Sequence, residues 1–433
     1  MSILSTLSSG VSGLNAYGEG LSVVGNNIAN MNTVGFKDGT PSFADIVSAS
    51  LSGGTSNSQV GRGVFVDSVM TDFTQGSFET TSNGLNLAVD GSGMFEVADA
   101  AGAINYTRNG TFQLDKNGML VNPDGLFVQG YQANAAGVLT GQVGNLDLAN
   151  TAFPPLATAN LTLAANLDSS GAVTGPFVLA NAAQTSNFST GITVYDSLGN
   201  SHLINLYFSK TAANAWSWNA VVSAADSANA VTEVQARGTL TFNSSGALTA
   251  QSATTYLSGG APATGFNFSG GAAANQAVAM NMGTPLPGGT GLNGVTQFAG
   301  SSEVLNLTQD GYATGSLESV SVGKDGTISG LFTNGKNRTL GQIALANFDS
   351  PEGLSHLGNN LYGATADSGA PIVGAPSTSG MGTILSGSLE LSNVDLAQQF
   401  TNMIEYQRGF DANSKVITTT DQMLQTLVNI KQS

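Results

Sequence analysis

The sequence contains no cysteine. Disulfide frameworks, thiolate nucleophiles and thiolate metal sites are therefore excluded. Histidine is almost as scarce, because only His202 and His356 occur and they lie far apart in the chain. We interpret His202 as a surface side chain beside a hairpin turn. Since the carboxylates are scattered and no calcium-loop spacing is present, we expect no metal site and no cofactor.

Charge is also sparse, and most of it is negative. Charged residues make up 9% of the chain, and 28 Asp and Glu outnumber 12 Lys and Arg. A net charge of −16 excludes in practice the basic surface that binds nucleic acid. No apolar run approaches the roughly 18 residues of a membrane span. We therefore expect no nucleic-acid partner and no membrane insertion.

The sequence offers little for catalysis or for conventional secretion. Gly289, Gly291 and Gly294 match the spacing of a dinucleotide-binding loop, but they follow Pro and Gly residues instead of a buried strand, and no helical pattern follows them. No phosphate loop of the Walker type is present. The N-terminal region lacks the basic and apolar segments of a cleaved signal peptide. We expect a protein that is not an enzyme and, if exported, leaves without such a peptide.

A long helical pattern at the C-terminal end is the strongest positive signal. Residues recur at alternating steps of four and three, which is the period of a coiled-coil seam. Ser392, with Asp395 three residues later, predicts the N-terminal cap of this helix. Three residues of the seam, Gln407, Ser414 and Asp421, are polar and either set the packing register of the helix or face a lumen. The seam consists of Leu396, Phe400, Met403, Gln407, Phe410, Ser414, Ile417, Asp421, Leu424 and Val428.

A second seam with the same period lies at the other end of the chain. Glu19 is the only charged residue between Met1 and Phe36, although a helix exposed to water normally carries charge on its outer face. Each glycine in this segment costs about 1 kcal/mol relative to alanine. We predict that the two terminal helices pair and that the first is ordered by self-association; an ordinary two-helix hairpin on a globular body is the plainer alternative. The seam consists of Leu4, Leu7, Val11, Leu14, Gly18, Leu21, Gly25 and Ile28.

Between the helices the pattern is typical of β-structure. Short alternating runs are separated by turn signals such as Asn109-Gly110 and Asp124-Gly125. Both tryptophans lie in one block bracketed by prolines, which indicates an inserted domain with its own core. The fold class is therefore α+β, with mainly β outer domains and long N- and C-terminal helices pairing as a coiled-coil-like inner domain. The predicted parts are terminal helices at 1–32 and 392–433, an irregular or short-stranded connector at 33–74 and 366–391, a β domain at 75–148 and 288–365, and an inserted outer β domain at 149–287.

Motifs at both ends resemble those of one protein family. Asn26-Asn27-Ile28-Ala29-Asn30, followed by Thr33-Val34-Gly35-Phe36-Lys37, is similar to the N-terminal signature of the bacterial flagellar rod and hook proteins. Ser392-Asn393-Val394-Asp395-Leu396 resembles their C-terminal signature. Tyr106-Thr107-Arg108-Asn109-Gly110 resembles an internal segment. The stretch from Thr308 to Gly315 is similar to the hook member specifically.

The resemblance implies a structural subunit of the flagellar hook, a flexible helical tube that transmits torque from the motor and rod to the filament. It also implies self-association, export by the flagellar type III apparatus to the extracellular hook, and contact with the distal rod, hook cap, hook-length control and hook–filament junction proteins. The alternatives are a distal rod protein and, in another class, a secreted β-rich adhesin or carbohydrate-binding protein.

The predicted assembly interface combines the two seams with the asparagine motif. Its residues are Leu4, Leu7, Val11, Leu14, Leu21, Asn26, Asn27, Ile28, Asn30, Leu396, Phe400, Met403, Ile404, Gln407, Phe410, Asn413, Ile417, Leu424 and Val428.

Overall fold

The computed structural model describes residues 3–47, 49–50, 59–148 and 152–432. These residues form a mainly β structure with one α-helix toward each end of the chain, α1 (Ile3–Ala29) and α2 (Leu396–Gln432), in agreement with the predicted α+β class. Two compact units account for the chain. The first comprises Met1–Thr151, Glu318–Leu331 and Asn337–Ser433, and the second comprises Ala152–Leu317 and Phe332–Lys336.

The N-cap of helix α2 lies three residues later in the chain than predicted. The Asp395 carboxylate accepts hydrogen bonds from the backbone N–H groups of Ala397 and Gln398, at 2.8 and 3.3 Å. Asp395 is therefore the N-cap. Ser392 accepts only from Val394, at 3.3 Å, in the extended segment before the helix. Because Asp395, and not Ser392, bonds the second and third N–H groups of the helix, α2 begins at Leu396.

The connector after α1, predicted as irregular or short-stranded, forms strands. Strands β1 (Gly39–Asp45) and β4 (Val64–Thr71) pair antiparallel over their whole length, and β2 (Ala49–Ser50) with β3 (Gln59–Val60) extends the ribbon. Both longer strands lie against α1. Glycine and serine obscured the alternating pattern of Val64, Val66 and Ser68, and packing on the helix stabilises a two-stranded ribbon that would be marginal alone.

The first unit is built around one large antiparallel sheet. The strand order along it is β23-β24-β25-β11-β7-β8-β28-β27, with β9, β10, β12, β26 and β29 attached at its sides. The strands are β7 (Met94–Ala98), β8 (Ile104–Thr107), β9 (Gln113–Leu114), β10 (Leu120–Val121), β11 (Phe127–Ala133), β12 (Leu139–Asn145), β23 (Leu317–Val322), β24 (Thr327–Phe332), β25 (Asn337–Ile343), β26 (Leu345–Asn347), β27 (Ser355–Gly358), β28 (Leu361–Gly363) and β29 (Ile372–Gly374).

Two short pairs connect the end of this unit to its beginning. Strand β30 (Thr383–Ser386) pairs with β6 (Leu87–Asp90), and β31 (Ser388–Glu390) pairs with β5 (Phe78–Thr80). Residues 383–390, assigned from sequence to the connector at 366–391, are therefore part of the β-structure. The backbone in front of α2 is fixed by these pairings.

The second unit is a β-sandwich. Its larger sheet has the order β14-β15-β16-β17-β19-β20, with β18 beside β17, and its smaller sheet has the order β21-β13-β22. Trp216 and Trp218 are fully buried in the core between them, together with Leu161 and Leu163 of β13. The strands are β13 (Asn160–Asn166), β14 (Phe188–Tyr195), β15 (Ser201–Ala212), β16 (Ala215–Val222), β17 (Glu233–Phe242), β18 (Leu248–Gln251), β19 (Thr255–Ser258), β20 (Ala261–Ala263), β21 (Ala279–Asn281) and β22 (Glu303–Gln309).

Strand β22 extends the second unit beyond the sequence-based limit of 287. It pairs with β13 from Leu161 to Asn166, so residues 303–309 complete the smaller sheet of the sandwich. The pairing partners are separated by well over one hundred residues of sequence, and no local pattern records such a pairing. The other predicted limit, 149, lies outside the described residues.

The prediction that His202 is a surface residue is wrong. Its ring is buried, stacks on Phe268 at 4.4 Å, and lies between Asp196 and Asp226 at 3.0 and 3.2 Å. Burial alone would raise the pKa of Asp196, but hydrogen bonds from His202, Asn200 and Leu198 hold that pKa below its ordinary value. The sandwich thus closes over one end of the β14–β15 hairpin and buries the histidine.

The sheet of the first unit contains a buried carboxylate with one unpaired oxygen among the described residues. Glu96 on β7 is buried, and its Oε2 atom has no hydrogen-bond partner within the described part of the chain. Burial raises the pKa of Glu96 above its ordinary value of 4.5. A raised pKa means that the folded state binds the proton more tightly than the unfolded state, so the ionised form destabilises the fold.

We expect Glu96→Gln to increase the free energy of unfolding of the first unit at pH 7, because a neutral amide is buried at lower cost than a carboxylate. The advantage should shrink as the pH falls through the raised pKa of Glu96 and vanish below 4.5, where the wild-type side chain is neutral in both states. Denaturation at several pH values measures this. An advantage that persists unchanged at low pH would contradict the electrostatic cause.

Candidate functional site

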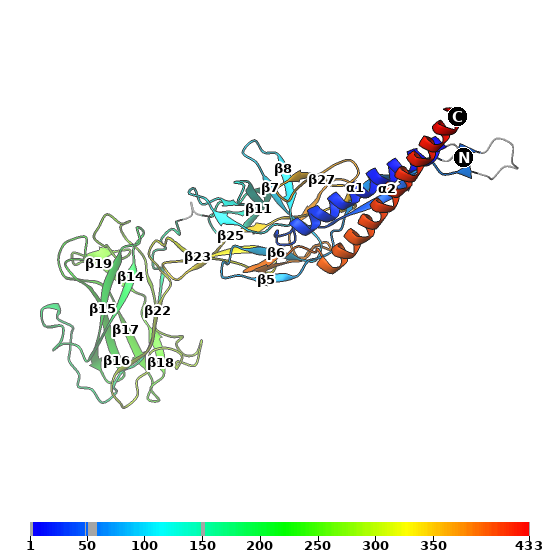
Figure 1. The fold of residues 1–433 in the computed structure, drawn as a ribbon. Helices are drawn as coiled ribbons and strands as arrows, with labels where there is room; N and C mark the ends of the chain where they lie inside the picture. Colours follow the sequence, from blue (N-terminus) through cyan, green and yellow to red (C-terminus); the bar gives the residue numbers. More distant parts are fainter. Residues whose placement is uncertain (1–2, 48, 51–58, 149–151, 433) are drawn as a thin grey trace. The chain divides into compact units, whose positions relative to one another are not determined.

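The two terminal helices lie side by side and antiparallel (Figure 1). A Cβ atom built on Gly10 of α1 would lie 3.1 Å from Ile417 of α2. At the other end of the contact, Asn27 donates a 3.3 Å hydrogen bond to Gln399. The N-terminal part of α1 therefore faces the C-terminal half of α2.

Small residues let the helices approach closely. A Cβ on Gly13 would lie 2.6 Å from the Asn413 amide oxygen, and one on Gly409 would lie 2.7 Å from the ring of Tyr17. The glycines counted from sequence only as a cost in helix propensity are thus partly a packing surface. The buried positions of α1 are Gly10, Gly13, Ala16, Gly20, Val24 and Asn27.

Three aromatic rings fill the middle of the contact. Tyr17 of α1, Tyr406 of α2 and Phe43 of β1 have ring centroids 5.8 to 6.2 Å apart. A Cβ on Gly20 would lie 3.1 Å from the Tyr406 ring, so glycine there leaves room for the cluster. Tilted and edge-to-face rings at such distances add to area burial. The ribbon therefore helps to hold the helix pair.

Asn27 fastens the C-terminal part of α1. It is 1% exposed, its Oδ1 accepts from the Gly39 N–H at 3.0 Å, and its Nδ2 donates to the Gly39 carbonyl at 2.8 Å. With its bond to Gln399, this one amide joins α1, β1 and α2. Asn30 instead bonds back to Asn26, at 2.9 Å, and ends the helix.

The predicted seams enter this contact at Ile417 and otherwise lie beside it, where they leave apolar area open. On α1, Val11 is exposed, and Leu7, Leu14, Leu21 and Ile28 are only partly buried; the side chain of Leu4 lies outside the described residues. On α2, Leu396, Met403, Phe410, Asn413, Ile417 and Leu424 are partly buried. The exposed members on α2 are Phe400 at 51%, Ile404 at 52%, Val428 at 54% and Gln407.

A buried charged cluster lies at the base of the helix pair. Lys37 contacts Glu390 at 2.6 Å with both side chains fully inaccessible, and Arg108 contacts the other Glu390 oxygen at 3.2 Å. Lys37 also donates to the Thr74 carbonyl at 2.6 Å. Arg108 donates to two backbone carbonyls of the β6 segment, those of Val89 and Gly91, at 3.0 and 2.7 Å. We call Lys37, Arg108 and Glu390 the charged cluster.

The electrostatics of the charged cluster follow from its burial. Burial lowers the pKa of Lys37 and of Arg108, and the attraction of Glu390 opposes both changes. One carboxylate thus offsets the charge of two cations in a site that is nearly closed to solvent. Glu390 also accepts from the Gly76 N–H at 3.0 Å, and its backbone carbonyl accepts from Gly35 at 2.8 Å.

The charged cluster joins the family motifs in space. Lys37 ends the Thr33-Val34-Gly35-Phe36-Lys37 motif, and Arg108 is the central residue of the Tyr106 motif. Asn393, in the C-terminal motif, accepts from the Asp38 N–H and donates to the Asp72 carbonyl, at 2.9 and 2.8 Å. The sequence motifs alone do not indicate this structural role. The scarcity of Lys and Arg is a possible sign that some of these side chains form buried ion pairs, but no spacing in the sequence indicates which ones.

Two further features of the described residues concern metal ligands and membrane-spanning helices. They contain no group of three or more His, Asp or Glu placed to hold a metal ion. Neither of their two α-helices combines the length and the apolar character needed to cross a membrane. The fold defines a class of mainly β proteins whose two terminal helices pair and keep apolar side chains exposed.

Comparison with known proteins assigns this class. Family models match at residues 7–37 (flagella basal body rod protein), 88–174 (flagellar hook protein FlgE/F/G D1 domain), 166–312 (flagellar basal body protein FlaE D2 domain) and 385–430 (flagellar basal body rod FlgEFG protein C-terminal). The first and last matches cover the two terminal helices, and the D2 match covers most of the sandwich.

Relatives resemble the chain over nearly its whole length. The flagellar hook protein FlgE of Escherichia coli K12 is 38% identical over 98% of this chain and 99% of that protein. Those of Salmonella typhimurium LT2 and Borreliella burgdorferi are each 37% identical, over 98% and 99% of this chain and 100% of each relative. The chain belongs to the flagellar hook protein family. The predicted hook assignment is confirmed over the distal rod.

Proposed function

We propose that this structural subunit of the flagellar hook polymerises through its terminal helices, which form the cohesive inner layer of a helical tube. The supporting observation is the open apolar area on both helices beside their contact line. The proposed interface is the predicted set of residues without Asn27, which is buried inside the chain, and its most exposed apolar members are Phe400, Ile404 and Val428.

The size of the open area supports this role. Fully burying a Phe, Leu or Ile side chain contributes about 2–3 kcal/mol. Because Phe400 and Ile404 are each about half exposed in the single chain, completing their burial in a polymer would add roughly 1 kcal/mol apiece. Several such residues on each copy, repeated along a tube, give substantial cohesion without a large contribution from any single contact.

The remaining proposed roles follow from membership of the flagellar hook protein family. The polymer transmits torque from rod to filament while bending, and its subunits are exported by the flagellar type III apparatus without a cleaved signal peptide. Its further partners are the distal rod, the hook cap, the hook-length control protein and the hook–filament junction proteins. The chain acts as a structural protein and not as an enzyme, with no cofactor.

We expect the double substitution Phe400→Asp and Ile404→Asp to abolish polymerisation of the purified chain. Both side chains are exposed, so the monomer should keep its fold while two buried charges per contact oppose assembly. Sedimentation and electron microscopy of concentrated protein measure the polymer, and circular dichroism measures the fold.

Gln398→Asp is the matched control. Gln398 is exposed on another side of the same helical turn, so its substitution places one such negative charge away from the open apolar area. The control should polymerise as the wild-type chain does. Normal tubes from the double variant would contradict the proposed interface.

A further inference from the structure

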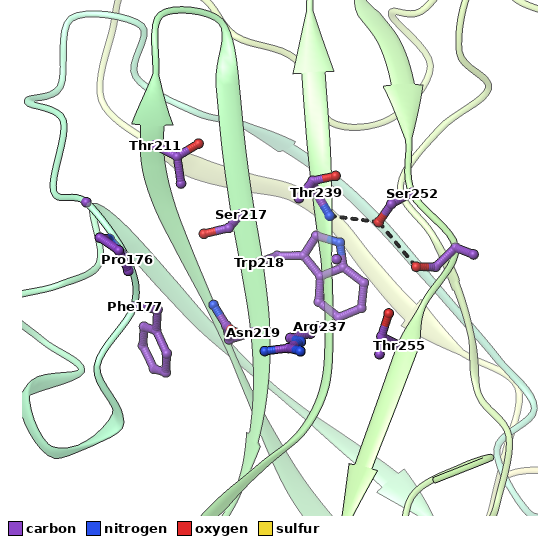
Figure 2. A pocket seen from close by; sticks show the side chains of 13 residues that line it. Pro176, Phe177, Thr211, Ser217, Trp218, Asn219, Arg237, Thr239, Ser252 and Thr255 are labelled. Carbon is purple, nitrogen blue, oxygen red and sulfur yellow. Dashed lines mark hydrogen bonds between the residues drawn. The ribbon is translucent and has the colours of Figure 1, made fainter. Parts of the chain in front are cut away.

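The outward face of the larger sheet in the second unit carries a trough unrelated to the helices. Its hollow has a volume of about 650 Å³, within the range of sites that bind small molecules. Figure 2 shows its floor on β16 and β17, with the segment containing Pro176 and Phe177 on one side and Ser252 and Thr255 on the other. Trp218 lies beneath the floor, on the core side.

A registered row of polar side chains crosses the floor. Asn219 of β16 pairs with Arg237 of β17, which pairs with Thr255 of β19. On neighbouring strands such residues lie about 4.8 Å apart, so the Asn219 amide and the Arg237 guanidinium can contact one ligand group together. Figure 2 shows these two side chains next to each other.

The polar side chains of this row have no hydrogen-bond partner among the residues that the structure describes. Asn219 is only 7% exposed, yet its amide makes no hydrogen bond within the described part of the chain. Arg237 has neither an ion pair nor a hydrogen bond there, although the chain carries 28 acidic residues. Both polar groups line the hollow, so they can donate hydrogen bonds to a group that enters it.

Other groups in the trough define the ligand further. The hydroxyls of Ser217, Thr239 and Thr255 also make no hydrogen bond among the described residues and line the hollow. Phe177 gives an apolar wall and is held against Tyr207 at 5.4 Å. The floor is a sheet face and not a sheet edge, so an extended peptide cannot add to it by main-chain pairing.

We propose that the trough binds a carboxylate-bearing saccharide of one or two sugar units, a role beyond hook assembly. Arg237 and Asn219 hold the carboxylate, since guanidinium groups bind carboxylates through charge-assisted hydrogen bonds. The hydroxyl groups exchange hydrogen bonds with those of the sugar. Phe177 packs against the apolar face of the ring.

The test is calorimetric and ligand-observed NMR titration of the full-length chain with digalacturonate, glucuronate and N-acetylneuraminate. We expect saturable binding of at least one of them. The methyl ester of that saccharide, which keeps the hydroxyls and loses the charge, should bind about tenfold more weakly. Arg237→Gln should weaken binding of the acid by a similar factor. Arg62→Gln removes one exposed positive charge from the first unit and should leave binding unchanged.

Three results would overturn the proposal: no saturable binding of any of the three acids, equal affinity of the acid and its ester, or unchanged affinity in Arg237→Gln. A fourth would reassign the trough. If Arg237→Gln changes self-association measured by sedimentation but not saccharide binding, the trough receives a carboxylate from a second copy of the chain. Tryptophan fluorescence verifies that each variant keeps the second unit folded, since both tryptophans lie there.

Discussion

Replacing Glu390 with Gln should destabilise the first unit by about 3–5 kcal/mol, the range measured when one partner of a buried ion pair is removed. Glu390 is the only carboxylate in contact with the inaccessible Lys37 and Arg108 in the described structure. Its loss leaves two buried cations uncompensated, and their desolvation is no longer offset. The backbone that Glu390 connects, at Gly35 and Gly76, should loosen with it.

The two units permit a selective measurement of this effect. Both tryptophans belong to the second unit and both α-helices belong to the first. Chemical denaturation followed by helical circular dichroism should therefore shift in Glu390→Gln, whereas tryptophan fluorescence should not. Glu79→Gln is the control, because Glu79 is exposed on β5 and pairs with Leu389, next to Glu390.

A second substitution tests whether stability is lost because the attraction to Glu390 is missing or because two buried cations lack a counter-charge. Adding Lys37→Met to Glu390→Gln removes one of the two stranded cations, so we expect the double variant to regain part of the lost stability. A double variant less stable than Glu390→Gln alone would show that the charged cluster acts through packing. A loss below about 1 kcal/mol in the single variant would show that the site is not dry.

Gly13→Leu should force the terminal helices apart. A Cβ there already meets the Asn413 side chain at 2.6 Å, and a leucine adds three more carbons at the closest point of the contact. Overpacking of this kind typically costs 1–3 kcal/mol, partly offset by about 0.5–1 kcal/mol of better helix propensity. We expect a net loss of stability in the first unit and, on the proposed function, no polymer.

Gly18→Leu makes the same chemical change five residues further along α1, and we expect it to increase the stability of the first unit. No atom lies within 4 Å of a Cβ at Gly18, so the helix gains propensity without a clash. Denaturation of the monomer followed by helical circular dichroism compares the two variants. If both stabilise, or both destabilise equally, the small-residue face of α1 has no role in pairing the helices.

The charged cluster gives the helix pair a rigid base. Contact between Lys37 and Glu390 joins residues separated by 353 positions, and Arg108 ties the same carboxylate to the β-structure. Asn27 and the Tyr17, Phe43 and Tyr406 rings then fasten the helices to the ribbon. The β-structure thus positions both helices while their outer apolar faces stay open.

Some of this was available from sequence because it is encoded locally. A repeat of three and four residues determines a helix wherever it occurs, so both terminal helices and the α+β class could be predicted. Turn residues predicted hairpins such as the one beside His202, which joins β14 to β15. The paired motifs at the two ends identified the family, since their order and placement are seldom met by chance.

Only the tertiary structure decided which helix face packs inside the chain and which stays open. Gly10, Gly13 and Gly20 have no side chains, so a search for apolar periodicity passes over them, although close approach requires them. The same holds for the charged cluster and for β22, where partners far apart in sequence meet. Long-range pairing depends on the whole chain having folded, and no local pattern of residues records it.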